Sequence, residues 1–261
     1  MAGVTVLLGT VALEPNRWAT VDPSGAPTIR LSRWLDEIAG AGFDGIELWD
    51  RHLTAAAPTE VDAVLAHPLP VTVFNSYVGF DDPDPAPRAD AAGWIRRAGS
   101  EAVKFNAGAD RGRLGTYAER VVEWIEELPE GVRLLCECHE GTIAEDPHLA
   151  ADLLGRTGPA ERVQAIVHTH EPADHLRARF DAYGERITHV HVNFLDAAHH
   201  APPLAQVRGR LEAQVDLLRS LGFDGSWTVE FTHGLLTEDD RPEVLVPRAA
   251  EDLRVLRDVL G

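Results

Sequence analysis

The sequence predicts a single (β/α)8 barrel, the TIM barrel class of α/β proteins, with residues 1–261 forming one domain. Short apolar runs of strand length recur along the whole chain, and stretches with helical spacing of apolar residues separate them. The length of 261 residues is typical of one such barrel. The competing doubly wound sheet normally carries a glycine-rich phosphate loop after an early strand, and this sequence has none.

The strand-like runs are rich in Val, Ile, Leu and Phe, as expected for parallel strands that are buried on both faces. They lie at residues 4–13, 45–49, 71–75, 102–106, 133–137, 164–168, 188–192 and 227–231. The intervals between them leave room for a helix after each strand. Eight strands, each followed by a helix, make a closed barrel the expected arrangement.

Helical spacing is clearest in four of the intervening stretches. Residues 28–39 place apolar side chains at 31, 34, 35 and 38, which is the i, i+3, i+4, i+7 pattern of one helix face. The same spacing recurs at 117–128, 207–221 and 253–260. Residues 81–90 are rich in Pro and Asp and predict a surface loop after the third strand.

Composition limits the partners of the protein. The formal net charge of −18 disfavours nucleic acid, because binding to a phosphate backbone needs clustered Lys and Arg. No apolar stretch approaches the roughly 20 residues that cross a membrane, and no basic leader precedes the first strand, so we expect a cytoplasmic protein. Cys136 and Cys138 do not form a disulfide framework, and we expect buried thiols that face away from the site.

Four later strand-like runs each end in a residue that can bind a metal ion. These residues are Glu137, His168, His191 and Glu230. The carboxyl ends of barrel strands meet at one mouth, so we expect the four side chains to converge there. Two carboxylates and two imidazoles suit one divalent ion, and Mn, Co, Fe or Zn is favoured over Mg, which prefers oxygen ligands.

Motifs along nearly the whole chain resemble the xylose isomerase-like TIM barrel superfamily, which includes sugar isomerases and epimerases, dehydratases and endonuclease IV. The motifs are GFDGIELW, ECHEGT, HVHVNFLD and the late VEF. In that superfamily a metal ion is commonly held by Glu, Asp, His and Glu after strands 5, 6, 7 and 8. Glu137, His191 and Glu230 match this pattern, so the resemblance implies a metal-dependent enzyme that acts on a sugar.

The sixth strand departs from the superfamily pattern. Relatives often have Asp-x-x-His there, whereas this chain has His168, Thr169, His170 and Glu171. His168 stands in the place of the Asp and Glu171 in the place of the His. The site becomes richer in nitrogen, and His170 or Glu171 remains an alternative ligand to His168.

Further side chains are predicted to line the mouth and bind substrate. They are His139, Lys104, Asn106, Glu171, Asn75 and Trp18. Asn75 and Asn106 stand where endonuclease IV-like relatives carry metal-binding histidines, so neither a trinuclear zinc site nor DNA repair is expected. The resemblance implies a substrate contact for His139 after strand 5. Lys104 is placed to hold a hydroxyl or enolate oxygen, and Trp18 to form an apolar wall against a sugar.

The expected reaction on a sugar or keto-sugar is proton abstraction next to a carbonyl, through an enediolate, with Glu137 and Glu230 exchanging the proton. Return of the proton gives an isomerase or an epimerase. Loss of a β-substituent instead gives a lyase, a dehydratase or β-eliminase acting on a keto-sugar, keto-inositol or 3-keto-glycoside. A non-catalytic sugar-binding barrel subunit is the remaining alternative. Relatives often form dimers or tetramers, so the resemblance is compatible with a homo-oligomer.

Overall fold

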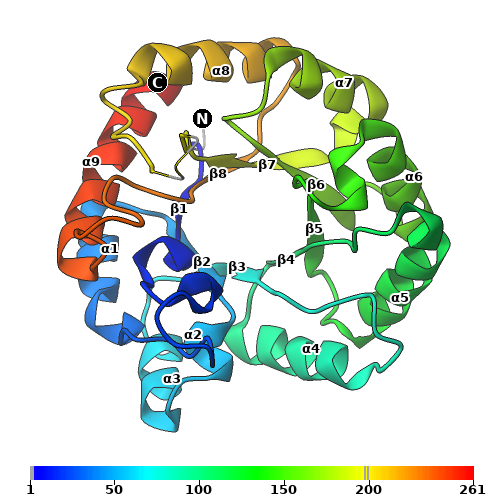
Figure 1. The fold of residues 1–261 in the computed structure, drawn as a ribbon, viewed down its shortest axis with the longest axis horizontal. Coiled ribbons are helices and arrows are strands. Elements are labelled where there is room, and N and C mark those ends of the chain that lie inside the picture. Colours follow the sequence, from blue (N-terminus) through cyan, green and yellow to red (C-terminus); the bar gives the residue numbers. More distant parts are fainter. Residues whose placement is uncertain (1–2, 197, 199) are drawn as a thin grey trace. The chain divides into compact units, whose positions relative to one another are not determined.

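The computed structural model describes residues 3–196, 198 and 200–261. Within them, eight parallel strands close into a barrel in the order β1 to β8, which confirms the predicted fold class (Figure 1). The described residues group into two compact units. Unit 1 draws on Met1–Thr72, His168–His170 and Val190–Gly261, and unit 2 on Val73–Val167 and Glu171–His189. The single domain over the whole chain stays a prediction.

The strands are short and almost entirely buried, which explains why their sequences are continuous apolar runs. They are β1 (Val6–Gly9), β2 (Gly45–Trp49), β3 (Val71–Asn75), β4 (Ala102–Phe105), β5 (Arg133–Glu137), β6 (Val163–His168), β7 (Ile187–Val192) and β8 (Ser226–Val229).

Helices follow the strands along the chain. They are α1 (Leu35–Ala41), α2 (Arg51–Thr54), α3 (Pro58–Leu65), α4 (Ala86–Ala98), α5 (Leu114–Glu127), α6 (Pro147–Thr157), α7 (Ala173–Tyr183), α8 (Arg208–Ser220) and α9 (Pro242–Leu260). Among the short 3-10 turns, η1 (Thr10–Leu13) and η2 (Arg17–Ala19) follow β1 directly, and η3 (Leu31–Arg33) precedes α1.

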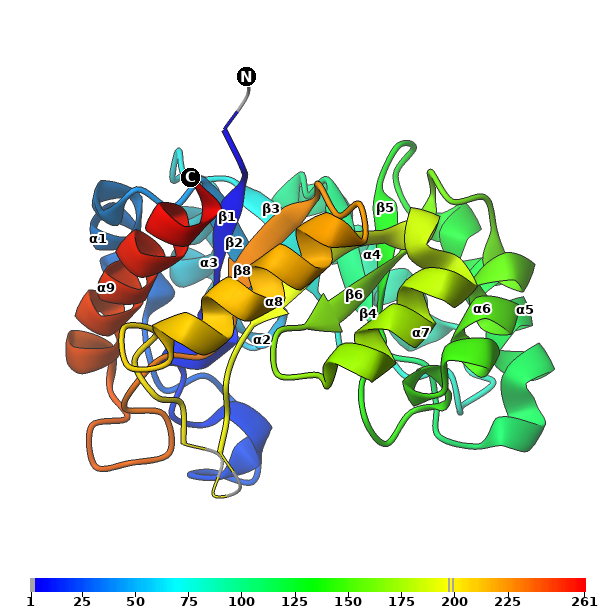
Figure 2. The same cartoon turned by 90° about the horizontal axis from the view of Figure 1, so that it is seen from above.

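In unit 1, β1 pairs with both β2 and β8, with Leu7 beside Gly45 on one side and beside Thr228 on the other. Gly45 is required there, because a Cβ atom would lie only 2.3 Å from the Thr72 hydroxyl oxygen. Helix α9 packs against α8 and α1, and Figures 1 and 2 show it beside them.

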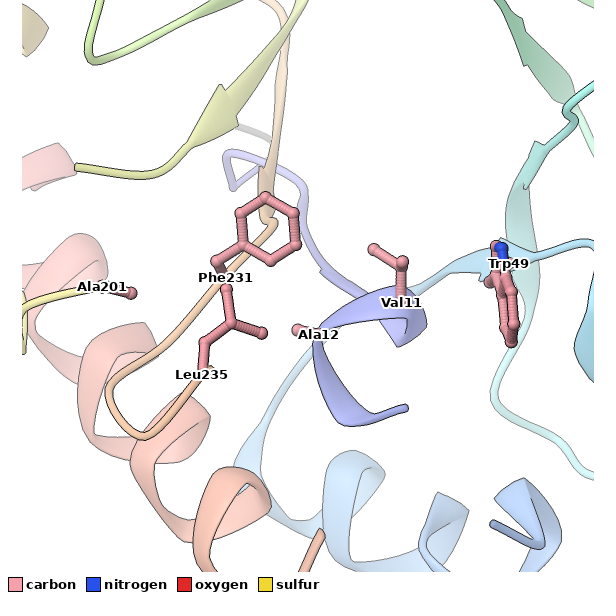
Figure 3. Close-up of a cluster of buried hydrophobic side chains, with 6 residues drawn as sticks. All are labelled: Val11, Ala12, Trp49, Ala201, Phe231 and Leu235. Atoms are coloured by element: carbon pink, nitrogen blue, oxygen red, sulfur yellow. The ribbon is translucent and has the colours of Figure 1, made fainter. Parts of the chain in front are cut away.

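An apolar cluster in unit 1 covers the region beyond the carboxyl ends of β1, β2 and β8. Its members are Val11, Ala12, Trp49, Ala201, Phe231 and Leu235, with Leu195 and Leu236 packed against them. Figure 3 shows Phe231 and Leu235 close together and Val11 and Ala12 on the turn that follows β1. Phe231, a member of this cluster, directly follows Glu230, so the cluster fixes the chain immediately beyond a predicted ligand.

In unit 2, β3 to β6 pair in sequence order and α4 to α7 pack against their neighbours in the same order. Aromatic rings fill the space between strand and helix: Phe80, Phe105 and Trp124 contact one another edge to face, with centroids 5.6 to 6.3 Å apart. This packing fixes β4, which carries Lys104 toward the barrel mouth.

Two predicted elements are shorter than expected. The strand predicted at 4–13 ends at Gly9, because the chain turns into η1 and the Glu14 amide bonds to the Val11 carbonyl at 3.3 Å. The helix predicted at 28–39 begins only at Leu35, because the Ser32 amide and hydroxyl both donate to Glu60 at 2.8 Å. Short apolar runs do not distinguish a strand from a turn of helix.

The loop predicted at 81–90 is also shorter, since α4 already begins at Ala86. Asp84 explains this start, because its carboxylate accepts from the Ala86 amide at 3.0 Å. Acidic and proline residues favour the first turn of a helix as well as a loop, so the composition of this segment was ambiguous.

Cys136 and Cys138 are buried free thiols, as expected. Across the described residues, no helix combines the length and the apolar character that membrane crossing requires.

Candidate metal centre

His168, His191 and Glu230 come together in unit 1 from three neighbouring strand ends. His168 is the last residue of β6, His191 lies in β7 and Glu230 follows β8 directly. Backbone hydrogen bonds hold these ends in register, from the Thr169 amide to the His191 carbonyl at 3.0 Å and from the Glu230 amide to Val192 at 3.2 Å. All three side chains are buried, and each offers a ligand atom within 4.8 Å of the others.

The His191 ring is oriented by Glu47, a residue of β2. Glu47 Oε2 lies 3.0 Å from His191 Nε2 and accepts a second hydrogen bond from the Thr228 hydroxyl at 3.0 Å. A carboxylate only accepts, so Nε2 carries the proton that it donates to Glu47. The other ring nitrogen, Nδ1, faces Glu230 Oε1 at 3.3 Å. This is the arrangement in which a carboxylate fixes the tautomer of a metal-binding histidine.

The spacing of Nδ1 and Oε1 fits a shared metal ion. Two ligand atoms that are each about 2.1 Å from an ion lie about 3.0 Å apart in an octahedral site and about 3.4 Å apart in a tetrahedral one. The observed separation between His191 and Glu230 is 3.3 Å. Two imidazoles and a carboxylate are also the donor set that Zn, Mn, Co and Fe accept more readily than Mg does.

Asn193 links His170, two residues beyond β6, to the same carboxylate, and sequence reasoning missed it. Its side-chain amide donates to Glu230 Oε2, while its Oδ1 lies 2.6 Å from His170 Nδ1. His170 therefore reaches Glu230 through Asn193, whereas the His168 ring stands 5.2 Å from the His191 ring. The two-residue spacing from His191, which places both side chains on one face of the strand, was the available signal.

In unit 2, the structure brings Glu137, Lys104 and Asn106 together. Lys104 Nζ lies 2.5 Å from Glu137 Oε2, and the Asn106 amide donates to the same oxygen at 2.8 Å. Lys104 Nζ also contacts Asn106 Oδ1 at 3.2 Å and lies 5.0 Å from the centre of the Tyr77 ring. The buried lysine therefore has a charged partner, which offsets the cost of removing both charges from water.

Glu171 belongs to a different buried network in unit 2. Arg179 Nε donates to Glu171 Oε2 at 2.6 Å, and the same guanidinium donates to the carbonyls of Cys138 and Ala144 at 2.9 Å. It also donates to the Tyr183 hydroxyl at 2.7 Å. Burial alone would lower the pKa of Arg179. The acidic groups beside it, those of Cys138, Glu171 and Tyr183, outweigh burial and raise that pKa above its ordinary value. Arg179 thus stays charged and ties Glu171 to the chain that leaves β5.

The other three predicted substrate residues lie outside these two networks of unit 2. His139 is exposed, and its Nδ1 lies 2.6 Å from the Glu140 carbonyl. Asn75 is buried as the last residue of β3. Trp18 in unit 1 is 51% exposed, and its indole meets the Phe231 ring edge to face at 5.8 Å.

A family model described as xylose isomerase-like TIM barrel matches residues 35–259. Among solved structures, the chain is similar to an IolI protein with a bound zinc atom, with a TM-score of 0.65 and 15% identity over 98% of both chains. It is also similar to ZgEngAGH5_4 in complex with a cellotriose, with a TM-score of 0.55 and 12% identity over 96% of this chain and 95% of that one.

A further similar structure is YagE from E. coli K12, a prophage protein of the dihydrodipicolinic acid synthase family in complex with pyruvate. Its TM-score is 0.53 and its identity 11%, over 98% of this chain and 81% of that one. At these identities the likeness concerns the fold alone. No protein of curated function matches the sequence.

Proposed function

The chain belongs to the xylose isomerase-like TIM barrel family, and from this premise we propose that it is a divalent-metal-dependent sugar isomerase or epimerase. The observation that carries the proposal is the placement of His191 between two carboxylates. Glu47 orients one ring nitrogen and the other faces Glu230 at 3.3 Å, beside His168. The zinc atom in the similar IolI structure supports metal binding by a barrel of this fold.

We assign His168, His191 and Glu230 as ligands of one ion and Glu137 as the fourth. Glu137 ends β5, and the carboxyl ends of all strands in a closed parallel barrel lie at the same mouth. Lys104 and Asn106 both bind Oε2 of Glu137 and hold its carboxylate in a fixed orientation. The nitrogen-rich donor set favours Mn, Co, Fe or Zn.

A bound divalent ion would supply polarisation of the substrate carbonyl. In the proposed reaction Glu137 would remove a proton from the carbon next to that carbonyl, which leaves an enediolate, and Glu230 in its protonated form would return a proton. Exchange with solvent would then take the proton from Glu137 and protonate Glu230 again. The Asn193 amide donates to Glu230 Oε2, which holds this carboxylate in place before substrate arrives. The Lys104 ammonium provides positive charge where negative charge develops on a substrate oxygen.

The substrate in this proposal is a sugar or keto-sugar. Amide side chains of Asn75 and Asn106, together with His139 and Lys104, offer hydrogen bonds to its hydroxyl groups. Glu171 acts through Arg179 rather than by direct contact, given the 2.6 Å ion pair between them. The net charge of −18 argues against nucleic acid as a partner, and the two free cysteines suit the reducing cytoplasm.

A lyase is the second candidate, acting on a keto-sugar, keto-inositol or 3-keto-glycoside. The observation that favours it is His168 at the end of β6, because the family pattern has an aspartate there. Replacing a carboxylate by a neutral imidazole leaves more net positive charge on the ion, which helps a β-substituent to leave with its bonding electrons.

Metal content of the purified protein is the first test, with Glu230→Gln as the diagnostic variant. We expect about one transition ion per chain in the wild type and a loosened ion in the variant, since an amide is a weaker ligand than a carboxylate. Glu238→Gln is the matched control, because Glu238 is an exposed glutamate in the loop after β8. No ion in the wild type after incubation with Mn, Co and Zn would overturn the proposal.

Solvent deuterium distinguishes the reaction classes. The metal-loaded protein is incubated in deuterium oxide with candidate ketoses, and proton NMR follows the loss of the signal next to the carbonyl. Deuterium incorporation with a new sugar identifies the isomerase or epimerase, and absorbance of an enone product identifies the lyase. A metal-loaded protein that binds sugars and exchanges no proton would be the non-catalytic barrel subunit.

A further inference from the structure

Asp252 is a buried carboxylate of unit 1 that the proposed mechanism does not use. It lies on α9 and is 3% exposed. Its Oδ2 accepts a hydrogen bond from the Thr232 hydroxyl at 2.6 Å, and its Oδ1 accepts one from the Leu204 amide at 2.8 Å. Thr232 and Leu204 are buried as well. One side chain of the helix therefore holds two separate loops, with one oxygen for each.

These two loops leave the strands that carry two of the proposed ligands. Residues 193–207, the β7–α8 loop, follow the strand of His191, and residues 230–241, the β8–α9 loop, begin with Glu230 itself. Thr232 lies two residues beyond Glu230. Its hydrogen bond to the helix therefore limits the movement of the backbone that carries this ligand.

The two loops also contact each other directly. His233 Nδ1, in the β8–α9 loop, lies 3.4 Å from the carbonyl of Ala201 in the β7–α8 loop. Ala201 packs with Phe231 and Leu235 in the apolar cluster, which Figure 3 shows. Asp252 then ties both loops to the same helix, so a shift of one loop is resisted by the other.

The charge of Asp252 has a cost for stability. Burial raises the pKa of this carboxyl above its ordinary value, although the hydrogen bonds from Thr232 and Leu204 and the nearby His233 act to lower it. A carboxyl with a raised pKa binds its proton more tightly in the folded state than in the unfolded chain, so its charge opposes folding at neutral pH. An asparagine would fill the same space without a charge. A residue that costs stability in this way is a candidate for a role in the site.

We propose that Asp252 is a positioning residue for the metal centre. Through Thr232 it sets the backbone that carries Glu230, and through Leu204 it couples this backbone to the loop that follows the strand of His191. The inference rests on the proposed function and adds a residue to the same site. His191 Nδ1 and Glu230 Oε1 lie 3.3 Å apart, and one ion spans them only while both strand ends keep their places.

The first test measures Mn affinity by competition with a chromophoric chelator. Thr232→Val keeps the branched shape of the side chain and removes the hydroxyl that binds Asp252, so we expect affinity to fall about 10-fold. Thr232→Ser keeps the hydroxyl and should retain most of the affinity. Thr237→Val is the matched control and should bind like the wild type. It removes the bond from the Thr237 hydroxyl to the Gly234 carbonyl at 2.8 Å, which lies in the same loop and does not involve Asp252.

Asp252→Asn separates positioning from stability. The new side chain keeps its shape and still accepts from the Leu204 amide, but its NH2 group cannot accept from the Thr232 hydroxyl. We expect stability in urea at pH 7 to match or exceed that of the wild type while Mn affinity falls. The proposal is overturned by an Asp252→Asn variant that loses stability and binds Mn like the wild type, or by a Thr232→Ser variant that binds as weakly as Thr232→Val.

Hydrogen exchange of the chelator-stripped protein measures the positioning without any metal. The Glu230 amide donates to the Val192 carbonyl at 3.2 Å, so its exchange rate reports how firmly this backbone is held. We expect the Glu230 and Leu204 amides to exchange faster in Thr232→Val than in Thr237→Val. Unchanged rates would overturn the proposal.

Failure here is distinguishable from failure of the proposed function. Faster exchange of both amides in Thr232→Val, in a protein that binds no ion, would keep Asp252 as the positioning residue of Glu230 and remove the metal-dependent enzyme. A wild type that binds one ion, with the same affinity in Thr232→Val, would keep the metal centre and remove the role of Asp252.

Discussion

His191 lies between two carboxylates, and the identity of the ring nitrogen that faces each one decides what the site can bind. Its Nε2 lies 3.0 Å from Glu47, and its Nδ1 lies 3.3 Å from Glu230. With the proton of a neutral ring on Nε2, a lone pair on Nδ1 faces a carboxylate oxygen. Two acceptors this close need a cation between them, either a second proton or a metal ion. The site is therefore built for positive charge.

The role of Glu47 can be measured without knowing the substrate. Glu47→Gln removes the charge that fixes the His191 tautomer, so we expect divalent metal affinity to fall about 10- to 100-fold. Competition with a chromophoric chelator measures the affinity. Thr228→Val is the control, because it removes the other hydrogen bond to Glu47 and leaves the charge in place. Equal affinities in wild type and Glu47→Gln would show that Glu47 does not tune the ligand.

Glu14 predicts a pH dependence of stability. Burial raises the pKa of Glu14, but hydrogen bonds from His52, Thr28 and Asn16 outweigh burial and lower that pKa from 4.5 to about 2. The folded state binds this proton less tightly than the unfolded state does. The resulting stabilisation, no more than about 3 kcal/mol, is therefore present above pH 4.5 and is lost as the pH falls toward 2.

Urea unfolding at pH 7 and pH 3 tests this dependence. Glu14→Gln should be destabilised at pH 7 and should lose less stability than the wild type between the two pH values. Asp224→Asn, which removes an exposed carboxylate, controls for the loss of a charge. Parallel losses in wild type and Glu14→Gln would contradict the assignment of the low pKa to Glu14.

At the residue scale, the sequence allowed prediction of side chains that sit at strand ends and little else. Glu230 and His191 follow from strand periodicity, because a ligand at a strand end has a fixed direction. Asn193 and Arg179 act through hydrogen bonds to partners that are distant in sequence. Such partners depend on where two separate elements meet, and no local pattern encodes that.

At the element scale, Arg179 joins α7 to the ends of β5 and β6. Its guanidinium reaches the Cys138 carbonyl after β5, the Ala144 carbonyl further along, and the Glu171 carboxylate after β6. Cys138 is the neighbour of Glu137, so this one side chain fixes the chain beyond a proposed ligand. A loop anchored to a helix in this way keeps its strand-end carboxylate in place.

Breaking this pair should destabilise the fold strongly. Arg179→Met removes the guanidinium that binds the buried Glu171 carboxylate at 2.6 Å, and we expect a loss of about 3 to 5 kcal/mol in urea unfolding. Adding Glu171→Leu should restore much of the loss, because the buried negative charge that Arg179 had compensated is then gone. Arg156→Met is the control, since it breaks the exposed ion pair of Arg156 with Asp152 on α6. A double variant no more stable than Arg179→Met alone would contradict this account.

The limits of prediction at this scale lie in the loops. Strands and long helices were predictable because their periodicity is local. The segment after β1 was not, because Glu14 and Asn16 hold it through side-chain hydrogen bonds instead of a repeating backbone pattern. Sequence reasoning therefore extended the first strand to residue 13 and missed the turn that carries Trp18.

At the scale of the whole molecule, the barrel could be predicted because eight strand-like runs alternate with helical stretches along the chain. That alternation leaves a barrel or an open sheet as the main choices, and the missing phosphate loop favoured the barrel. The net charge of the chain could also be counted from the sequence. How much this charge lowers stability depends on the cations that the protein binds. A net charge of −18 repels itself in the compact state, so any divalent cation should screen it to some extent.

Specific metal binding should stabilise the whole fold beyond this screening. An ion that binds only the native state at 100 times its dissociation constant raises the free energy of unfolding by about 2.7 kcal/mol. We expect Mn or Zn to raise the melting temperature of the wild type, and Mg at equal concentration to raise it less. Specific binding at the metal site is indicated by the difference in melting temperature between the two ions. Either rise alone would not distinguish it from screening.

Glu230→Gln should abolish the difference between Mn and Mg while leaving the effect of Mg intact, because screening depends on total charge and not on one ligand. Calorimetric melting of both proteins, stripped with chelator and then titrated with each salt, makes the comparison. If Mn and Mg raise the melting temperature of the wild type equally, the divalent ions act only on the net charge and the four residues do not form a metal centre.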